Sequence, residues 1–267
     1  MYIVVNRAMA IDHSSFSYPL LGGVPMAKRK RDVQERQCNN NPYLTKLDFT
    51  PDVDQALYLK TMENTPVVFV DAKAGTGKTT LAVRAGFEML RKGLVQRILY
   101  IRFPDDRYLK QGFLPGTLEE KEAKLFHPFF DALKELNVSE AALKQLRLQE
   151  QIVLETDTTM RGRTLKYDFV IIDEAQNARK ISDLQLLLTR IHDGDANGVS
   201  RGVVIGHSGQ QDNRGVELTK NLKLTPFQAY KYHMLKAPFT KECELKNNYR
   251  GQISQHADMI QESLEEL

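Results

Sequence analysis

The chain has 267 residues, of which 42% are hydrophobic and 27% charged, and its formal net charge is +3. Such values are typical of an ordinary globular protein, and no run approaches the roughly 18 apolar residues that cross a bilayer, so we expect no membrane partner. Cys38 and Cys243 belong to no metal-ligand pattern, which argues against a disulfide framework or a structural zinc site and favours a cytoplasmic location. The small positive charge leaves a nucleic-acid partner open.

The first part of the chain differs in character from the rest. Residues 1–44 lack sustained periodicity and are predicted to form a flexible arm ahead of one domain at residues 45–267. Met26 opens a stretch that resembles a protein start, so one hypothesis is that residues 1–25 are not translated. The basic run at residues 28–31 is either a solubilising tail or a contact for a phosphate backbone.

Short apolar runs alternate with helical segments through the remainder. Strands are predicted at 66–70, 97–101, 152–154, 169–172 and 202–205. Helices are expected at 79–92, over the 121–136 region behind a capping box at 117–120, from Ser182 or Asp183 with Leu184, Leu187, Leu188 and Ile191 on one face, and at 252–265. Strands that are apolar on both faces and alternate with helices predict the α/β class, a parallel sheet flanked by helices.

The segment AKAGTGKT at residues 72–79 follows the first strand and opens the first of these helices. It matches the phosphate-binding pattern GxxxxGK[ST] except at its first position, which is alanine. Gly75 and Gly77 allow a tight turn whose N–H groups point at phosphate oxygens. Lys78 is expected to reach the β- and γ-phosphates, and the Thr79 hydroxyl to bind Mg²⁺. The alternative is a glycine-rich turn that binds nothing.

Two further sets of polar residues follow apolar strands. Asp173 and Glu174 end the fourth strand; Asp173 is predicted to hold magnesium opposite Thr79, and Glu174 to orient or deprotonate the attacking water. After the fifth strand, Gln210 is the candidate for sensing the γ-phosphate, the alternative being a plain loop.

Arg250 is a candidate for stabilising the transferring phosphoryl group, in its own chain or across a subunit interface, or else is a surface arginine.

The motifs together resemble one family. The AGTGKT loop, then GFLPGTLEEK at 112–121, MRGRT at 160–164 and IDEAQN at 172–177 occur in the order and spacing of the PhoH-like proteins. That resemblance implies a P-loop NTPase (RecA-like) fold similar to superfamily 1 helicases, with ATP binding and hydrolysis, and some members act on RNA. Arg161 and Arg163 suit phosphate contacts or pairing with local acids.

The resemblance also implies which positions touch the nucleotide. Gln55, upstream of the first strand, resembles the adenine-reading glutamine of these ATPases. The expected cofactor-contacting set is Gln55, Ala72, Lys73, Ala74, Gly75, Thr76, Gly77, Lys78, Thr79 and Thr80, beside the acidic pair.

The chain departs from the family pattern in two places. Arg102 stands where the family has an arginine followed by proline, but here Phe103 intervenes. The family has Gly-Asp, two residues and glutamine after the last of these strands, whereas this chain has Gly206-His207 before Gln210. These differences indicate a divergent member, and a phage origin is one hypothesis that fits them.

The leading functional hypothesis is a magnesium-dependent ATPase coupled to RNA or single-stranded DNA. Because the chain has room for one RecA-like domain, a homo-oligomer, as a ring, is expected. The alternative is a nucleotide-dependent switch or scaffold with little hydrolysis, motivated by His207. A small-molecule kinase is disfavoured because residues 207–240 contain only Arg214 where an arginine-rich lid is expected.

Overall fold

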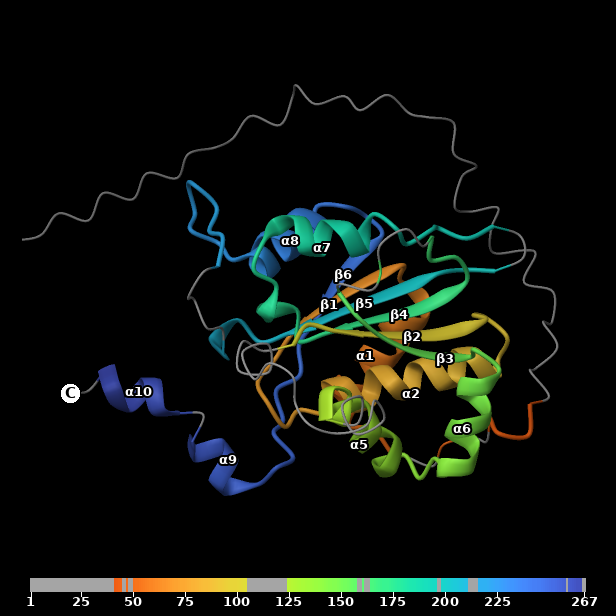
Figure 1. Cartoon of the computed structure of the whole chain (residues 1–267). Helices are drawn as coiled ribbons and strands as arrows, with labels where there is room; N and C mark the ends of the chain where they lie inside the picture. The colour runs from red at the N-terminus through yellow and green to blue at the C-terminus, as the bar shows by residue number, and fades with distance from the viewer. Residues whose placement is uncertain are drawn as a thin grey trace, which may run out of the picture. The chain divides into compact units, whose positions relative to one another are not determined.

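A computed structural model describes residues 41–44, 47, 50–104, 124–157, 160, 164–195, 198–210, 216–257 and 259–265. Its centre is a six-stranded sheet in the order β3-β2-β4-β5-β1-β6, in which every paired strand is parallel (Figure 1). The strands are β1 (Val67–Asp71), β2 (Arg97–Arg102), β3 (Ile152–Thr156), β4 (Asp168–Asp173), β5 (Arg201–Gly206) and β6 (Thr240–Cys243).

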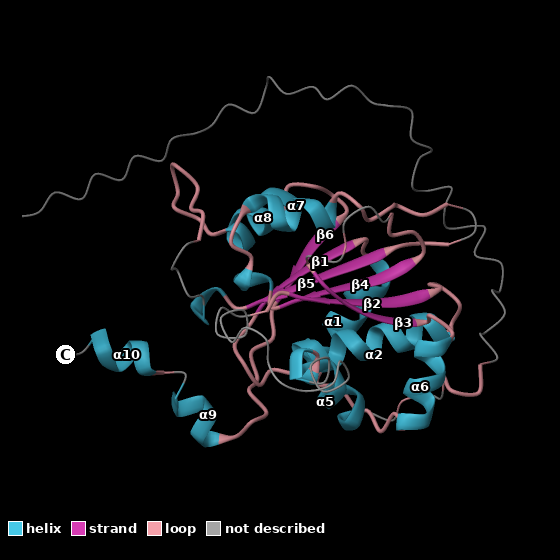
Figure 2. Ribbon diagram, viewed as in Figure 1, coloured by secondary structure: helices cyan, strands magenta, loops and turns pink. Residues whose placement is uncertain are grey.

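Helices cover both faces of the sheet, as Figure 2 shows. They are α1 (Val53–Asn64), α2 (Lys78–Arg91), α5 (His127–Glu135), α6 (Glu140–Leu148), α7 (Ile181–Leu188), α8 (Pro226–Met234), α9 (Gln252–Ala257) and α10 (Ile260–Glu265), with short 3₁₀ turns η2 (Ala175–Asn177) and η3 (Ser208–Gln210). No helix in the described ranges is long and apolar enough to cross a bilayer.

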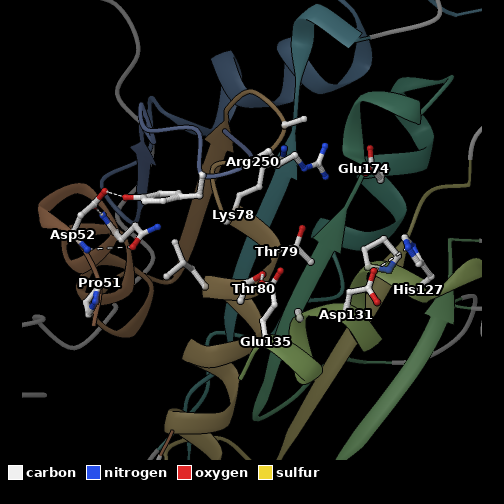
Figure 3. Close-up of a pocket in the computed structure, with 18 of the residues that line it drawn as sticks. Pro51, Asp52, Lys78, Thr79, Thr80, His127, Asp131, Glu135, Glu174 and Arg250 are labelled. Carbon is white, nitrogen blue, oxygen red and sulfur yellow. Dashed lines mark hydrogen bonds and ion pairs between the residues drawn. The ribbon is translucent and has the colours of Figure 1, made fainter. Parts of the chain in front are cut away.

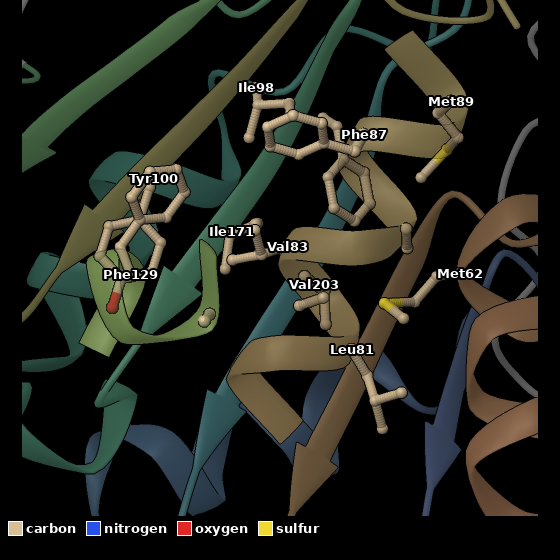
Figure 4. Close-up of a cluster of buried hydrophobic side chains, with 14 of the residues drawn as sticks. Met62, Leu81, Val83, Phe87, Met89, Ile98, Tyr100, Phe129, Ile171 and Val203 are labelled. Atoms are coloured by element: carbon tan, nitrogen blue, oxygen red, sulfur yellow. The ribbon is translucent and has the colours of Figure 1, made fainter. Parts of the chain in front are cut away.

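Alternation along each strand divides the core into two layers. On β1, Val68 and Val70 belong to the cluster under α1, α2, α5 and α6, whereas Val67 and Phe69 belong to the cluster under α7 and α8. Figure 4 shows the first cluster, with α2 lying over the middle strands. Gly86 permits this close approach, because a Cβ there would lie 2.9 Å from the Phe169 ring. The sheet therefore fixes α2, and with it the loop between β1 and α2.

The predicted α/β class and its five strands are confirmed; β1 is shifted by one residue at the same length, and the other four strands are longer than predicted by one or two residues. The short edge strand β6 was not predicted, because TKEC is polar at its two central positions and too brief to show a pattern. Helices α1, α6 and α8 were also missed. The capping box at 117–120 lies outside the described residues, and the helix expected nearby is described as α5.

Two of the predicted helices differ from the structure in their bounds. Helix α7 begins after Lys180, and Asp183 sits one turn inside, where its carboxylate accepts the N–H of Lys180 at 2.8 Å. Ile191 lies beyond the end of α7 and forms an isolated bridge with Leu165. The segment 252–265 is interrupted and forms two short helices instead of one.

The end of the expected N-terminal arm belongs to the folded domain. Leu44 is buried in the α2-side core and Tyr43 packs against it. The side-chain amide of Asn41 donates to Gln149 and Gln151, both at 2.7 Å. Residues 41–44 are therefore anchored by apolar burial that the polar sequence around them concealed; residues 1–40 lie outside the described part.

Candidate nucleotide-binding site

The loop between β1 and α2 has the backbone shape that its glycines permit. Gly75 and Gly77 adopt φ values of +80° and +79°, which other residues rarely adopt. The Thr76 hydroxyl and the Lys78 ammonium both donate to the carbonyl of Lys73, at 3.1 and 3.2 Å. The loop is thus held in a compact turn that leads directly into the N-terminus of α2, where free N–H groups and the helix dipole favour an anion.

The Lys78 ammonium lies in this loop, and no carboxylate of the described residues is bonded to it. Burial lowers its pKa, while the charges of Asp173 and Glu174 act in the opposite direction. Arg250 also lies near enough to lower the pKa of Lys78 by repulsion. A partly desolvated cation beside a helix N-terminus is a site that an anionic ligand such as a phosphate group would stabilise.

Thr79 and Asp173 meet at the carboxyl end of β4. The Thr79 hydroxyl donates to Asp173 Oδ2 at 3.1 Å, and the Glu174 N–H donates to Asp173 Oδ1 at 3.0 Å. Asp173 is only 1% exposed, and its pKa is raised by burial and by the neighbouring charge of Glu174. A buried carboxylate that would gain from a cation, next to a hydroxyl, is an oxygen donor pair that fits Mg²⁺.

The small number of protein oxygens at this position, from Thr79 and Asp173, also suits magnesium. Within the described ranges, no three His, Cys, Asp or Glu side chains gather into a metal site. Magnesium in nucleotide sites is held by one or two protein oxygens, with phosphate oxygens and waters supplying the rest. Thr79 and Asp173 are the residues that would hold it here.

Glu174 follows at a strained position, with φ at 55° in the left-handed region. Its carboxylate accepts a hydrogen bond from the side-chain amide of Gln176 at 2.6 Å. The amide oxygen of the same Gln176 accepts the backbone N–H of His207 at 3.1 Å. Gln176 therefore connects the acidic pair to the loop that follows β5.

The phosphate loop, with Lys78 and Thr79, lines one cleft of about 960 Å³ together with Glu174 (Figure 3). Pro51 and Asp52 lie at one end of the view and His127 and Asp131 at the other, with Lys78 between them. The Gln55 amide nitrogen lies 3.5 Å from where a Cβ on Gly77 would be, so Gln55 borders the phosphate loop. Its Oε1 accepts the N–H of Asp52 at 3.2 Å as part of the cap of α1.

The segment Asn247–Arg250 covers the loop from the C-terminal side. The Tyr249 N–H donates to the Gly75 carbonyl at 2.8 Å, and the Tyr249 hydroxyl and Asn247 amide both donate to the Asp52 carboxylate. A Cβ on Gly75 would lie 2.5 Å from Asn248 Oδ1, so glycine is required for this contact as well as for φ. Arg250 consequently lines the cleft of its own chain.

The structure brings together most of the predicted site residues. Those that line the cleft are Gln55, Ala74, Gly75, Gly77, Lys78, Thr79, Thr80, Glu174 and Arg250, with Asp173 bonded behind Thr79. Ala72 and Thr76 are buried in the loop. Lys73 does not line the cleft and contributes its carbonyl to the loop.

Thr80 has a second contact, and the other predicted residues lie outside the cleft or outside the described residues. Thr80 lines the cleft, but its hydroxyl donates to Glu135 of α5 at 2.7 Å. Arg102 ends β2 and donates to the Leu125 carbonyl, outside the cleft. Gln210 ends η3 after β5, and its side chain lies outside the described part of the structure. Arg161 and Arg163 lie outside the described residues.

The part of the cleft that α5 lines was not predicted from the sequence. His127, Asp131 and Glu135 recur every four residues on one face of α5, and His127 Nε2 lies 2.9 Å from Asp131 Oδ2. The spacing was visible in the sequence, but nothing in it indicated that this polar face would turn toward the phosphate loop. Asp52 and Tyr249 were likewise missed, because their contact joins opposite ends of the domain.

The sequence matches known proteins of one family. The family model described as "PhoH-like protein" matches residues 50–235. The "PhoH-like protein" of Synechocystis is 35% identical over 158 residues, covering 59% of this chain and 46% of that protein. "Protein PhoH" of Escherichia coli is 31% identical over 183 residues, covering 67% and 48%. The chain thus spans about half the length of these relatives.

A solved structure, "Sulfolobus solfataricus SWI2/SNF2 ATPase core in complex with dsDNA", aligns with a TM-score of 0.39 and 14% identity, covering 76% of this chain and 46% of that one. A likeness at this level is partial, and nothing about function follows from it.

Proposed function

Because this chain belongs to the PhoH-like protein family, we propose that it binds ATP in the cleft and hydrolyses it with magnesium. The observation that carries the proposal is the hydrogen bond of 3.1 Å between Thr79 and Asp173, with Lys78 lining the same cleft. It joins the phosphate loop to the end of β4, so a hydroxyl, a carboxylate and an ammonium converge where a terminal phosphate and its cation would lie.

We propose a role for each residue. The N–H groups of the loop and the Lys78 ammonium bind phosphate oxygens, and Thr79 and Asp173 hold the cation, which neutralises charge on the phosphates when bound. Glu174 orients the attacking water and accepts its proton. Arg250 stabilises charge on the transferring phosphoryl group. Gln210 senses the γ-phosphate from the loop after β5.

The nucleic-acid part of the proposal is coupling of hydrolysis to RNA or single-stranded DNA. It is supported by the family resemblance and by basic residues such as those at 28–31. We further propose that the chain works in the cytoplasm as a homo-oligomeric ring, in which a neighbouring subunit would complete the nucleotide cleft. Light scattering with ATP and magnesium measures the assembly, and a monomeric mass would contradict the ring.

A second candidate function is a nucleotide-dependent switch that hydrolyses little. The observation that favours it is the bond of 2.6 Å between the Gln176 amide and Glu174 Oε2, which engages one oxygen of the carboxylate expected to receive the proton of water. His207 contributes only its backbone N–H to this arrangement, and its buried Nδ1 has no hydrogen-bond partner among the described residues. If this bond held Glu174 away from the attacking water, ATP would bind without being cleaved.

One experiment separates the two functions. Phosphate release from ATP is measured with and without magnesium and single-stranded RNA, for wild type and Glu174→Gln, and nucleotide affinity is measured for both by calorimetry. The ATPase predicts magnesium-dependent turnover that RNA accelerates and that Glu174→Gln abolishes while affinity is retained. Retained affinity with equal, background release from both proteins would reject hydrolysis and leave the switch.

A further inference from the structure

Tyr100 lies behind the acidic pair, in the middle of β2, and is fully buried. Its hydroxyl donates to Asp173 Oδ2 at 2.6 Å. Tyr100 pairs with Ile171 in the β2–β4 register, so its side chain lies on the same face as Asp173, one pleat before it. The ring is held by packing against Phe129, with ring centroids 5.0 Å apart. The phenol is therefore fixed with its hydroxyl against the Asp173 carboxylate.

The Asp173 carboxylate accepts hydrogen bonds from three separate parts of the chain. Oδ2 receives the hydroxyls of Tyr100 and Thr79, and Oδ1 receives the N–H of Glu174. An ionised carboxylate offers about four acceptor positions, so most of them are filled. Rotation of the carboxylate about its Cβ–Cγ bond would break these bonds at once, in a place where water cannot replace them.

We propose that Tyr100 is a positioning residue for the metal site, whose hydroxyl holds the Asp173 carboxylate in the one orientation that lets it act with Thr79. The inference rests on the proposed function, since it assigns magnesium to Thr79 and Asp173. Tyr100 does not touch the nucleotide cleft. Its loss should weaken the contribution of magnesium and leave the rest of the cleft intact.

The chain supplies a matched control in Tyr58. This tyrosine, on α1, is also fully buried and belongs to the same apolar cluster as Tyr100. Its hydroxyl has no hydrogen-bond partner within the described part of the chain. Tyr58→Phe and Tyr100→Phe thus delete the same atom from the same core, and only the second deletion removes a bond to the metal-binding carboxylate.

The test measures binding of a fluorescent ADP with excess EDTA and over a magnesium titration. For Tyr100→Phe we expect the magnesium concentration that gives half of the affinity gain to rise about tenfold, because a hydrogen bond to a charged group is lost. Affinity in EDTA should match that of wild type. Tyr58→Phe should follow wild type in both conditions, and high magnesium should restore the affinity of Tyr100→Phe.

Three outcomes would overturn the inference: an unchanged magnesium requirement in Tyr100→Phe, an equal rise in Tyr58→Phe, or an equal loss of affinity with and without magnesium. No step of this test needs hydrolysis. If magnesium raises the affinity of the wild type for the nucleotide but the wild type releases no phosphate from ATP, hydrolysis is rejected and the role of Tyr100 is not. If magnesium does not change the affinity of the wild type for the nucleotide, the metal site is rejected, and the role of Tyr100 is rejected with it.

Discussion

The Lys231 ammonium lies 2.8 Å from the Asp71 carboxylate, although 160 residues separate them in the sequence. Asp71 is the last residue of β1, immediately before the phosphate loop, and it also accepts the N–H and hydroxyl of Ser208, at 2.9 and 2.6 Å. Ser208 opens the loop after β5. One half-buried carboxylate thus joins the start of the phosphate loop, the loop after β5, and α8.

Replacement of Lys231 by methionine should destabilise the protein by about 1–2 kcal/mol at neutral pH, because Asp71 loses a charged donor while remaining half-buried. Burial alone would raise the pKa of Asp71, but bonds from Lys231 and Ser208 lower it below its ordinary value of 3.8. A lowered folded-state pKa gives stability that is present at neutral pH and lost as the pH falls through that pKa. The difference between the two proteins should therefore shrink below about pH 4, measured by urea unfolding.

Lys246→Met is the matched control for this change. Lys246 pairs with Glu244 at 3.7 Å, but both side chains are largely exposed, and such pairs contribute little. Equal destabilisation by the two substitutions would contradict a specific role for Lys231.

Lys78→Ala should lower the affinity for ATP by about tenfold to 100-fold, because a desolvated ammonium that binds phosphate is removed. Lys73→Ala, five residues earlier, should bind as wild type does, since Lys73 serves the loop through its backbone carbonyl. Calorimetric titration with a non-hydrolysable ATP analogue measures both. A comparable loss in Lys73→Ala would show that its side chain contacts the nucleotide.

Asp52→Ala should loosen the segment that covers the phosphate loop. Asp52 caps α1 through the Gln55 N–H at 2.7 Å and also holds Asn247 and Tyr249, so its loss should cost about 1 kcal/mol from the cap alone. Amide hydrogen exchange should quicken at Tyr249, whose N–H is bonded to Gly75. Tyr249→Phe keeps the cap, so it should quicken exchange at that amide with a smaller loss of stability. Unchanged exchange in both variants would disprove the tether.

Arg250→Ala should lower the rate of hydrolysis more than the affinity for ATP, because its guanidinium acts on charge that develops during phosphoryl transfer. Since Arg250 lines the cleft of its own chain, mixing Arg250→Ala with Lys78→Ala should not restore activity. Phosphate release from mixed and separate variants measures this. Recovery on mixing would show instead that the arginine acts across a subunit interface.

The parts of the fold that could be predicted were those with strong local signals. The apolar strands β1 and β4, and the glycines that require positive φ, are visible in short windows of sequence. The contacts that complete the site are not local. Tyr100 looks like an ordinary core residue within an apolar strand, and only the β2–β4 register brings its hydroxyl to Asp173.

Charged contacts between distant elements were equally hidden. Asp71 and Lys231 each look like a surface charge at the end or middle of an element, and Asp52 looks like an ordinary helix cap. Their partners are chosen by the order of strands in the sheet and by the path of the chain after β6. Neither can be deduced from the spacing of residue types in one sequence.

The place of β1 in the sheet bears on how the chain can fold as it is synthesised. Both neighbours of β1 come late: Val67 pairs with Gly202 of β5 on one side and with Thr240 of β6 on the other. A nascent chain must therefore extend well past residue 240 before the phosphate-loop strand is enclosed, and such distant pairings form slowly. Until then, the apolar run Val67–Val70 has two open edges, which invite aggregation. Fragments that end before Cys243 should be insoluble, because they lack β6. The enclosure of β1 therefore depends on the synthesis of β6.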